Sequence, residues 1–181
     1  MVHAKVVAFR KHNTTSEKIL APTDGSALSL AGALKAVDFA QRLQANLVVV
    51  SAIPAYQYPI YLGGIPFEYP SESEYEAQCR TIADGYLGMV VDIAREQGVL
   101  ATQRIEFNGN AAQSILGIAD DEHCNLVIMS SHGRSGLSRM FLGSVALKTL
   151  TLAHIPVLVD HPTPLDIAMA ESLMKEYAIE S

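Results

Sequence analysis

Tryptophan is absent from this chain of 181 residues, and aromatic residues make up only 7% of it. A core without large aromatic rings has to be built from Ala, Val, Leu and Ile, and 49% of the residues are hydrophobic. That proportion is typical of folded domains and excludes a disordered chain. The length suits one domain with a substantial core.

Cysteine is also scarce, since Cys79 and Cys124 are the only two and no CxxC motif occurs. This excludes a disulfide framework and a zinc ribbon, and it favours a reduced, cytoplasmic setting. The sequence has no apolar leader with a cleavage site and no apolar run of about 18 residues, so neither a signal peptide nor a transmembrane helix is expected. A net charge of −6 disfavours nucleic acid or an anionic membrane as the main partner.

Hydrophobic periodicity predicts strands and helices that alternate along most of the chain. Strands are expected at 18–23, 46–53, 101–107, 126–129 and 156–160. Helices are expected from Ser26 or Ser29 to Leu43, and at 74–97, 111–122, 144–152 and 164–177. This order predicts an N-terminal extension over 1–17, a single α/β domain over 18–160 and a helical C-terminal extension over 161–181. Val6–Phe9 in the first extension could form a small extra strand.

The strand predicted at Asn46–Ile53 is apolar without alternation, which indicates that both of its faces are covered, as in a parallel sheet. Together with the element order, this predicts a doubly wound, Rossmann-like parallel sheet of five strands with helices on both faces. Such sheets bind ligands at the carboxyl ends of the strands, where the strand order reverses. If the first and fourth strands are neighbours, Asp24 and Ser130–Gly133 share one crevice.

Glycine and serine residues flank the helix expected at 144–152. Gly133 follows the fourth strand, and Gly143-Ser144 opens the helix after nine intervening residues. Glycine lets the backbone approach an oxygen-rich ligand, and the free N–H groups of a helix start favour anions. Ser144 could cap the helix or bind a phosphate. The pattern fits a phosphate cradle, and it also fits an ordinary strand-to-helix loop.

These motifs together resemble the universal stress protein family. The resemblance covers about Glu17 to Asp160, through KILAPTDGS, the Gly109 turn, LVIMSSHGRSGLSRMFLGSVALKTL and HIPVLVD. In the nucleotide-binding branch of that family the pattern is Gly, two residues, Gly, nine residues, Gly and then Ser or Thr. Here Ser130 stands in place of the first glycine. A serine adds only a small group there, so we expect nucleotide binding to be tolerated.

The resemblance implies a pocket for ATP, with AMP or ADP as alternatives and Mg²⁺ held through the phosphates. Three residues would line its base and ribose side, Pro22, Thr23 and Asp24, with Ala52 beside the base. The floor and the phosphate end would be formed by Met129, Ser130, His132, Gly133, Gly143, Ser144 and Val145. Without this resemblance, Asp24 would be interpreted as the first residue of an Asp-Gly-Ser turn.

Other side chains offer competing functions. Ser131 and His132 could be a nucleophile and a base, but no G-x-S-x-G surrounds them and adjacent residues rarely face each other. The run from Asp120 to Cys124 contains potential metal ligands at the end of a helix, where a solvated charged terminus is the simpler interpretation. Arg134 and Arg139 could contact a phosphate or lie in solvent.

The segment from Pro54 to Ser73 predicts a long loop. Its aromatic residues could cover a ligand, pack within the loop or pack against another subunit; they are Tyr56, Tyr58, Tyr61, Phe67 and Tyr69. The resemblance implies a homodimer paired through the last strand, with no nucleic acid or membrane partner. It also implies a cytoplasmic stress-response regulator or sensor with at most slow ATP hydrolysis. The alternatives are a family member that acts through protein contacts alone, and a nucleotide hydrolase or transferase.

Overall fold

In the computed structural model, residues 17–58, 69–133 and 142–179 are described, and they form an alternating α/β chain. Five strands join one sheet: β1 (Lys18–Pro22), β2 (Asn46–Ile53), β3 (Ala101–Phe107), β4 (Leu126–Ser130) and β5 (Val157–Asp160). The helices are α1 (Ala27–Leu43), α2 (Glu72–Glu96), α3 (Ala111–Asp121), α4 (Ser144–Leu152) and α5 (Pro164–Glu176). All described pairings are parallel, in the order β3-β2-β1-β4-β5. The predicted doubly wound sheet is therefore confirmed.

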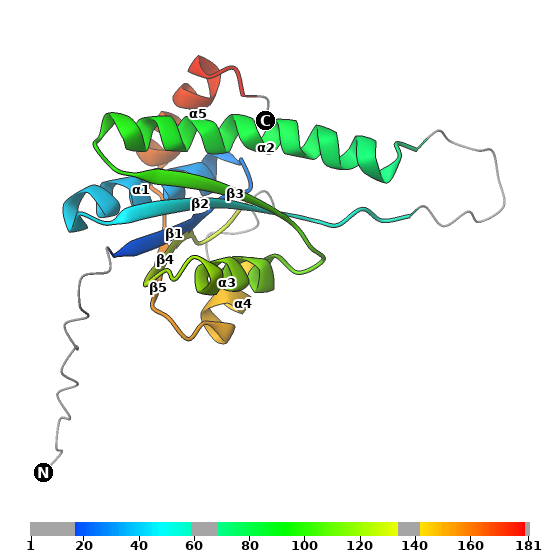
Figure 1. Cartoon of the computed structure of the whole chain (residues 1–181). Coiled ribbons are helices and arrows are strands. Elements are labelled where there is room, and N and C mark those ends of the chain that lie inside the picture. Colours follow the sequence, from blue (N-terminus) through cyan, green and yellow to red (C-terminus); the bar gives the residue numbers. More distant parts are fainter. Residues whose placement is uncertain (1–16, 59–68, 134–141, 180–181) are drawn as a thin grey trace, which may run out of the picture.

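Helices cover both faces of the sheet, which is why the central strands are apolar without alternation. The helices α1, α2 and α5 lie on one face, and α3 and α4 lie on the other (Figure 1). Each face has its own core. Leu30, Val37 and Leu87 belong to the first core, and Ile115 and Val127 belong to the second. The second core supports the ends of β1 and β4 from the side of α3 and α4.

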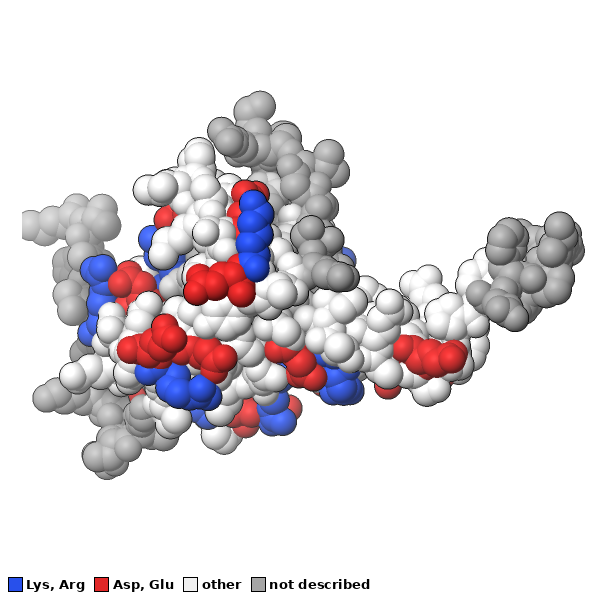
Figure 2. Space-filling model, turned by 90° about the horizontal axis from the view of Figure 1, so that it is seen from above, with Lys and Arg blue, Asp and Glu red and all other residues white. Residues whose placement is uncertain are grey.

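The outer surface of α1, α2 and α5 carries charges of both signs. Figure 2, which views the molecule from above this face, shows acidic and basic side chains interspersed. Two intrahelical ion pairs contribute to this pattern, between Asp38 and Arg42 in α1 and between Asp92 and Arg95 in α2. Such exposed pairs add little stability, so this face is best described as solvated.

The long helix α2 begins at Glu72, two residues before its predicted start. Ser71 caps it through a reciprocal capping box with Glu74. Loop tyrosines pack on this end of the helix, since the Tyr56 hydroxyl donates to the carbonyl of Pro70 at 2.7 Å. The Tyr58 hydroxyl donates to the Glu72 carboxylate at 2.7 Å. These two tyrosines thus hold the loop against the start of α2. Tyr61 and Phe67 lie outside the described residues, and so does the predicted Val6–Phe9 strand.

The terminal helix α5 packs mainly on α1, where it buries Ala170 and Met174. It therefore leaves the outer edge of β5 open, and the side chains of β5 are only partly buried. In the described part of the chain, none of the helices combines the length and apolar character that crossing a bilayer requires.

Candidate functional site

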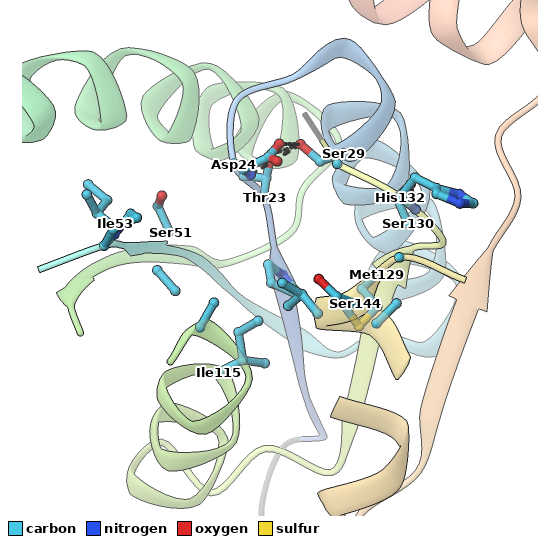
Figure 3. A pocket seen from close by; sticks show the side chains of 18 of the residues that line it. Thr23, Asp24, Ser29, Ser51, Ile53, Ile115, Met129, Ser130, His132 and Ser144 are labelled. Carbon is cyan, nitrogen blue, oxygen red and sulfur yellow. Dashed lines mark hydrogen bonds between the residues drawn. The ribbon is translucent and has the colours of Figure 1, made fainter. Parts of the chain in front are cut away.

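The strand order reverses between β1 and β4, which are hydrogen-bonded neighbours although helices and two other strands separate them in sequence. At their carboxyl ends lies a cavity of about 400 Å³. The residues predicted from the sequence line it without exception: Pro22, Thr23, Asp24, Ala52, Met129, Ser130, His132, Gly133, Gly143, Ser144 and Val145. The expectation that Asp24 and Ser130–Gly133 share one crevice is confirmed (Figure 3).

A network of hydroxyl groups fixes the Asp24 carboxylate at the start of α1. Its Oδ1 atom accepts hydrogen bonds from the Ser29 hydroxyl at 2.5 Å and from the Ser26 hydroxyl at 2.7 Å. The Ser29 hydroxyl also shares a hydrogen bond of 2.8 Å with the buried Thr23 hydroxyl. Ser26 is the N-cap of α1, so helix capping and carboxylate orientation depend on the same turn.

Gly25 lets this turn rest directly on α2. Its φ of +81° is the left-handed conformation that favours glycine, and an added Cβ would lie 2.6 Å from the Tyr86 ring. The Tyr86 hydroxyl in turn shares a hydrogen bond of 2.5 Å with the Ser51 hydroxyl near the end of β2. Tyr86 thus connects the Asp24 turn to the side of the cavity that contains Ala52.

Gly133 makes room for the Asp24 carboxylate. An added Cβ at Gly133 would collide with the Oδ2 atom of Asp24. Because a carboxylate repels a phosphate, the phosphates of a ligand would have to lie away from Oδ2, closer to α4.

The start of α4 faces the cavity through Gly143, Ser144 and Val145. Gly143 is the N-cap and Ser144 is the first helical residue, so of the two roles considered for Ser144, that of helix cap is excluded. Among the described residues, no side chain caps this end. The N–H of Gly143 donates to the Ser131 carbonyl at 2.8 Å, and the N–H groups that follow have no side-chain cap in the described part of the chain, which is the property that an anion site at a helix start requires.

Ser130, which stands in place of a family glycine, is 4% exposed. Its hydroxyl accepts a hydrogen bond from the backbone N–H of His132 at 3.3 Å. Its Cβ lies against α1, because a Cβ added at Gly32 would approach it to 2.9 Å. The extra atoms of Ser130 are therefore engaged by its own loop and by the neighbouring helix.

Ser131 and His132 do meet, contrary to the sequence-based argument that adjacent residues rarely face each other. The Nδ1 atom of His132 lies 3.1 Å from the Ser131 hydroxyl. However, the Nε2 atom of His132 is buried without a partner among the described residues. In Figure 3 the ring points away from Asp24 and Ser144. A triad needs a third group that orients the base, so this pair does not form one in the described structure.

The charged end of α3 forms ion pairs rather than a metal site. Glu122 contacts Lys18 at 3.2 Å and Arg104 at 2.7 Å, and Asp120 contacts His154 at 2.8 Å. Among the described residues, no group of three or more metal-ligating side chains occurs. Desolvation raises the pKa of the neighbouring Cys124 thiol to about 11. Arg134 and Arg139, considered for phosphate contact, lie outside the described residues.

Sequence reasoning missed a second group of cavity residues. They come from β2 and the two helices beside its end: Ser51, Ile53, Pro54, Cys79, Ile82, Tyr86, Ala111 and Ile115. The spacing of Cys79, Ile82 and Tyr86 places them on one face of α2 and could have marked that face as apolar. Nothing in the sequence indicates that this face borders the cavity.

The fold and the cavity define an open, parallel α/β protein with a cavity at the strand-order switch point, where sheets of this kind bind ligands. The family model of the universal stress protein family matches residues 15–161. "Universal stress protein MJ0531" of Methanocaldococcus jannaschii is 34% identical over 157 residues, which cover 83% of this chain and 85% of that protein. The chain therefore belongs to the universal stress protein family.

Solved structures agree with this assignment at the level of the fold. The universal stress protein UspA from Lactobacillus plantarum superposes with a TM-score of 0.66 at 22% identity, covering 81% of this chain and 99% of that one. A universal stress protein in complex with cAMP gives a TM-score of 0.55 at 20% identity and covers 82% and 98% of the two chains. The universal stress protein from Archaeoglobus fulgidus in complex with dAMP gives a TM-score of 0.57 at 18% identity, covering 80% of this chain and 97% of that one.

Proposed function

We propose that the cavity binds an adenine nucleotide and that the protein acts as a cytoplasmic regulator or sensor in a stress response. The observation that carries this proposal is the convergence of all eleven predicted residues on one cavity at the switch point. The complexes of related proteins with cAMP and dAMP support the choice of an adenine nucleotide. ATP is the ligand that the glycine pattern favours, with AMP and ADP as alternatives.

Within this proposal, the two ends of the cavity take different parts of the ligand. The phosphates bind at the start of α4, on the backbone N–H groups of Ser144 and Val145, whereas the N–H of Gly143 donates to the Ser131 carbonyl at 2.8 Å. Asp24, held by Ser26 and Ser29, accepts hydrogen bonds from the ribose hydroxyls or a base amino group. Ala52 and Met129 contact the base. A fixed carboxylate suits hydroxyl donors, because it needs no reorientation when the ligand arrives.

Hydrolysis of the nucleotide is expected to be slow at most. The sequence contains no GxxxxGK[ST] motif. Any Mg²⁺ would arrive on the phosphates, since the described residues offer no cluster of carboxylates or imidazoles to hold it. Ser131 and His132 are in contact at the cavity, but among the described residues no third group orients the imidazole.

We also propose that two copies pair through β5. This strand is an edge of the sheet, and α5 packs mainly on α1 instead of covering it. Antiparallel pairing about a two-fold axis would satisfy the open backbone groups of both copies. The neighbouring helix α4 exposes Leu147 and Leu152, 54% and 53% respectively, which adds apolar surface beside that edge.

The nucleotide proposal is tested by titration calorimetry of ATP and AMP against the full chain and two glycine variants. Gly133→Ala drives its Cβ into Asp24 and should weaken binding by about 1.4 kcal/mol or more, a tenfold change. Gly117→Ala is the matched control, because a Cβ there meets open space on α3. Mass spectrometry of nucleotide released from freshly purified, denatured protein identifies the bound species. Equal affinity of all three proteins would contradict the site, and no binding at all would favour a member that acts through protein contacts alone.

A further inference from the structure

The lining of the cavity extends beyond the residues that the family pattern predicts and includes residues of α2. We define the α2 lobe by Ile53 and Pro54 at the end of β2 and by Cys79, Ile82 and Tyr86 on α2. None of these five belongs to the predicted nucleotide site. The lobe adjoins that site, because Ala52 lies between Ser51 and Ile53 on the same strand.

The wall of the α2 lobe is apolar although part of it faces solvent. Ile82 is 43% exposed. The nearby exposed positions of α2 are occupied by polar residues, Thr81 and Asp84, so an isoleucine in this part of the helix is unusual. A branched aliphatic side chain left open at a cavity wall loses its contact with water when a ligand covers it. This exposure therefore indicates a surface suited to an apolar ligand group.

Two hydroxyl groups in the cavity lining at the lobe are hydrogen-bonded to each other. Ser51 and Tyr86 are 1% and 3% exposed, and their hydroxyl groups share a hydrogen bond of 2.5 Å. No charged side chain belongs to the five residues that define the lobe. An apolar group that enters the lobe would thus leave no buried charge unpaired, whereas a phosphate would find no cation.

Resting on the proposed function, we propose that the α2 lobe binds a neutral, apolar substituent carried on the adenine base. With phosphates at α4 and ribose at Asp24, the base points toward Ala52. The exocyclic amino group lies at the end of adenine remote from the ribose. A substituent on that amino group is therefore the part of the ligand that enters between Ile53 and Ile82. The ligand class is an N6-substituted adenine nucleotide.

The probes are AMP and N6-benzyl-AMP, titrated into the full chain by calorimetry. The wild-type protein is expected to bind N6-benzyl-AMP roughly three- to tenfold more tightly, because the ring removes apolar surface from water. Ile82→Trp fills the lobe and should weaken N6-benzyl-AMP about tenfold while leaving AMP nearly unchanged. Thr81→Trp is the matched control, with the same bulk on the neighbouring α2 position outside the cavity lining.

A second measurement needs no variant. Cys79 lines the lobe, whereas Cys124 is 6% exposed with its thiol held protonated by burial. Alkylation by iodoacetamide, followed by peptide mass spectrometry, therefore reports on Cys79 with Cys124 as an internal control. Saturating N6-benzyl-AMP should slow alkylation of Cys79 about fivefold more than saturating AMP does, because access limits the reaction.

The outcomes separate the two proposals. Binding of AMP with at least tenfold weaker binding of N6-benzyl-AMP would overturn the lobe assignment and leave the nucleotide site intact. Equal weakening of both ligands by Ile82→Trp, or equal protection of Cys79 by both, would also overturn it, since the base itself would then fill the lobe. If neither ligand binds, the proposed function and the inference that rests on it both fail.

Discussion

Gly32 of α1 lies directly against Ser130 at the end of β4. A Cβ added at Gly32 would be 2.7 Å from the backbone nitrogen of Ser130 and 2.9 Å from its Cβ. The absence of a side chain at Gly32 therefore lets α1 accept a serine where the family pattern has glycine. The Cβ of Ser130 is thus accommodated against α1, while Ser130 still belongs to the cavity lining.

The first prediction concerns this contact. Gly32→Ala should lower the free energy of unfolding by about 1–3 kcal/mol, the usual cost of overpacking a core, and urea denaturation measures it. In the Ser130→Gly background the loss should be smaller, because the Cβ contact is gone and only the backbone contact remains. Equal losses in both backgrounds would show that the two residues are not coupled.

Ser130→Gly by itself should change ATP affinity by no more than about 1 kcal/mol, the scale of one neutral hydrogen bond. Its hydroxyl accepts from the N–H of His132, and its Cβ faces α1. Calorimetry of this variant therefore tests whether the serine is compatible with a ligand. A gain of several kcal/mol would instead mean that Ser130 obstructs the site.

The second prediction concerns the orientation of Asp24. Ser29→Ala removes the donor at 2.5 Å from Oδ1 and leaves the Thr23 hydroxyl without that partner. Nucleotide affinity should fall about three- to tenfold, with a loss of about 1 kcal/mol in the free energy of unfolding. Ser114→Ala is the control, since that buried hydroxyl has no partner among the described residues. Unchanged affinity in Ser29→Ala would mean that the Ser29 hydroxyl is not needed to orient the carboxylate for the ligand.

Much of the fold could be predicted because its signals are local. The uninterrupted apolar run of Asn46–Ile53 indicated a strand covered on both faces, and β2 has that burial. The convergence of Asp24 with Gly133 followed from topology, because the carboxyl ends of parallel strands meet at one edge of the sheet. A repeated strand-helix order is thus sufficient to bring distant motifs into one cavity.

Long-range side-chain pairs could not be predicted in this way. Ser51 and Tyr86 come from a strand and a helix, and their contact depends on how α2 lies across the sheet. The contact between Gly32 and Ser130 likewise depends on the close approach of α1 to β4. The sequence also left the N-cap of α4 open, because Gly143 and Ser144 both suit that position and only backbone geometry separates them.

The third prediction concerns pH. The hydrogen bond from Lys18, and then that from Arg104, lowers the pKa of the Glu122 carboxyl. A lowered folded-state pKa stabilises the fold above the unfolded pKa, and this contribution is lost as the pH falls through the folded value. Glu122→Gln should therefore reduce the free energy of unfolding by about 0.5–1 kcal/mol at pH 7 and by much less near pH 3.

Urea denaturation at several pH values measures this difference. Glu106→Gln is the control, because Glu106 forms no ion pair among the described residues. Its effect on the free energy of unfolding at pH 7 should be small. A Glu122→Gln deficit that stays constant down to pH 3 would attribute the effect to packing rather than to charge.

The last prediction concerns the β5 edge. Backbone carbonyls of Pro156 and Asp160 accept hydrogen bonds from β4, at the N–H groups of Val127 and Ser131. Alternate residues of a strand direct their backbone groups to opposite neighbours, so the N–H of Val157 faces the open edge.

Val157→Pro therefore removes a donor needed for pairing with a second copy while sparing the bonds to β4. Light scattering at micromolar concentration should show a dimer for the wild type and a shift toward monomer for this variant. Val157→Ala keeps the N–H group and should remain dimeric. Because the substitution acts on an edge donor, the thermal stability of the monomer should change little relative to the loss of association. A monomeric wild type would refute pairing through β5, and a dimer retained in Val157→Pro would place the interface on another surface.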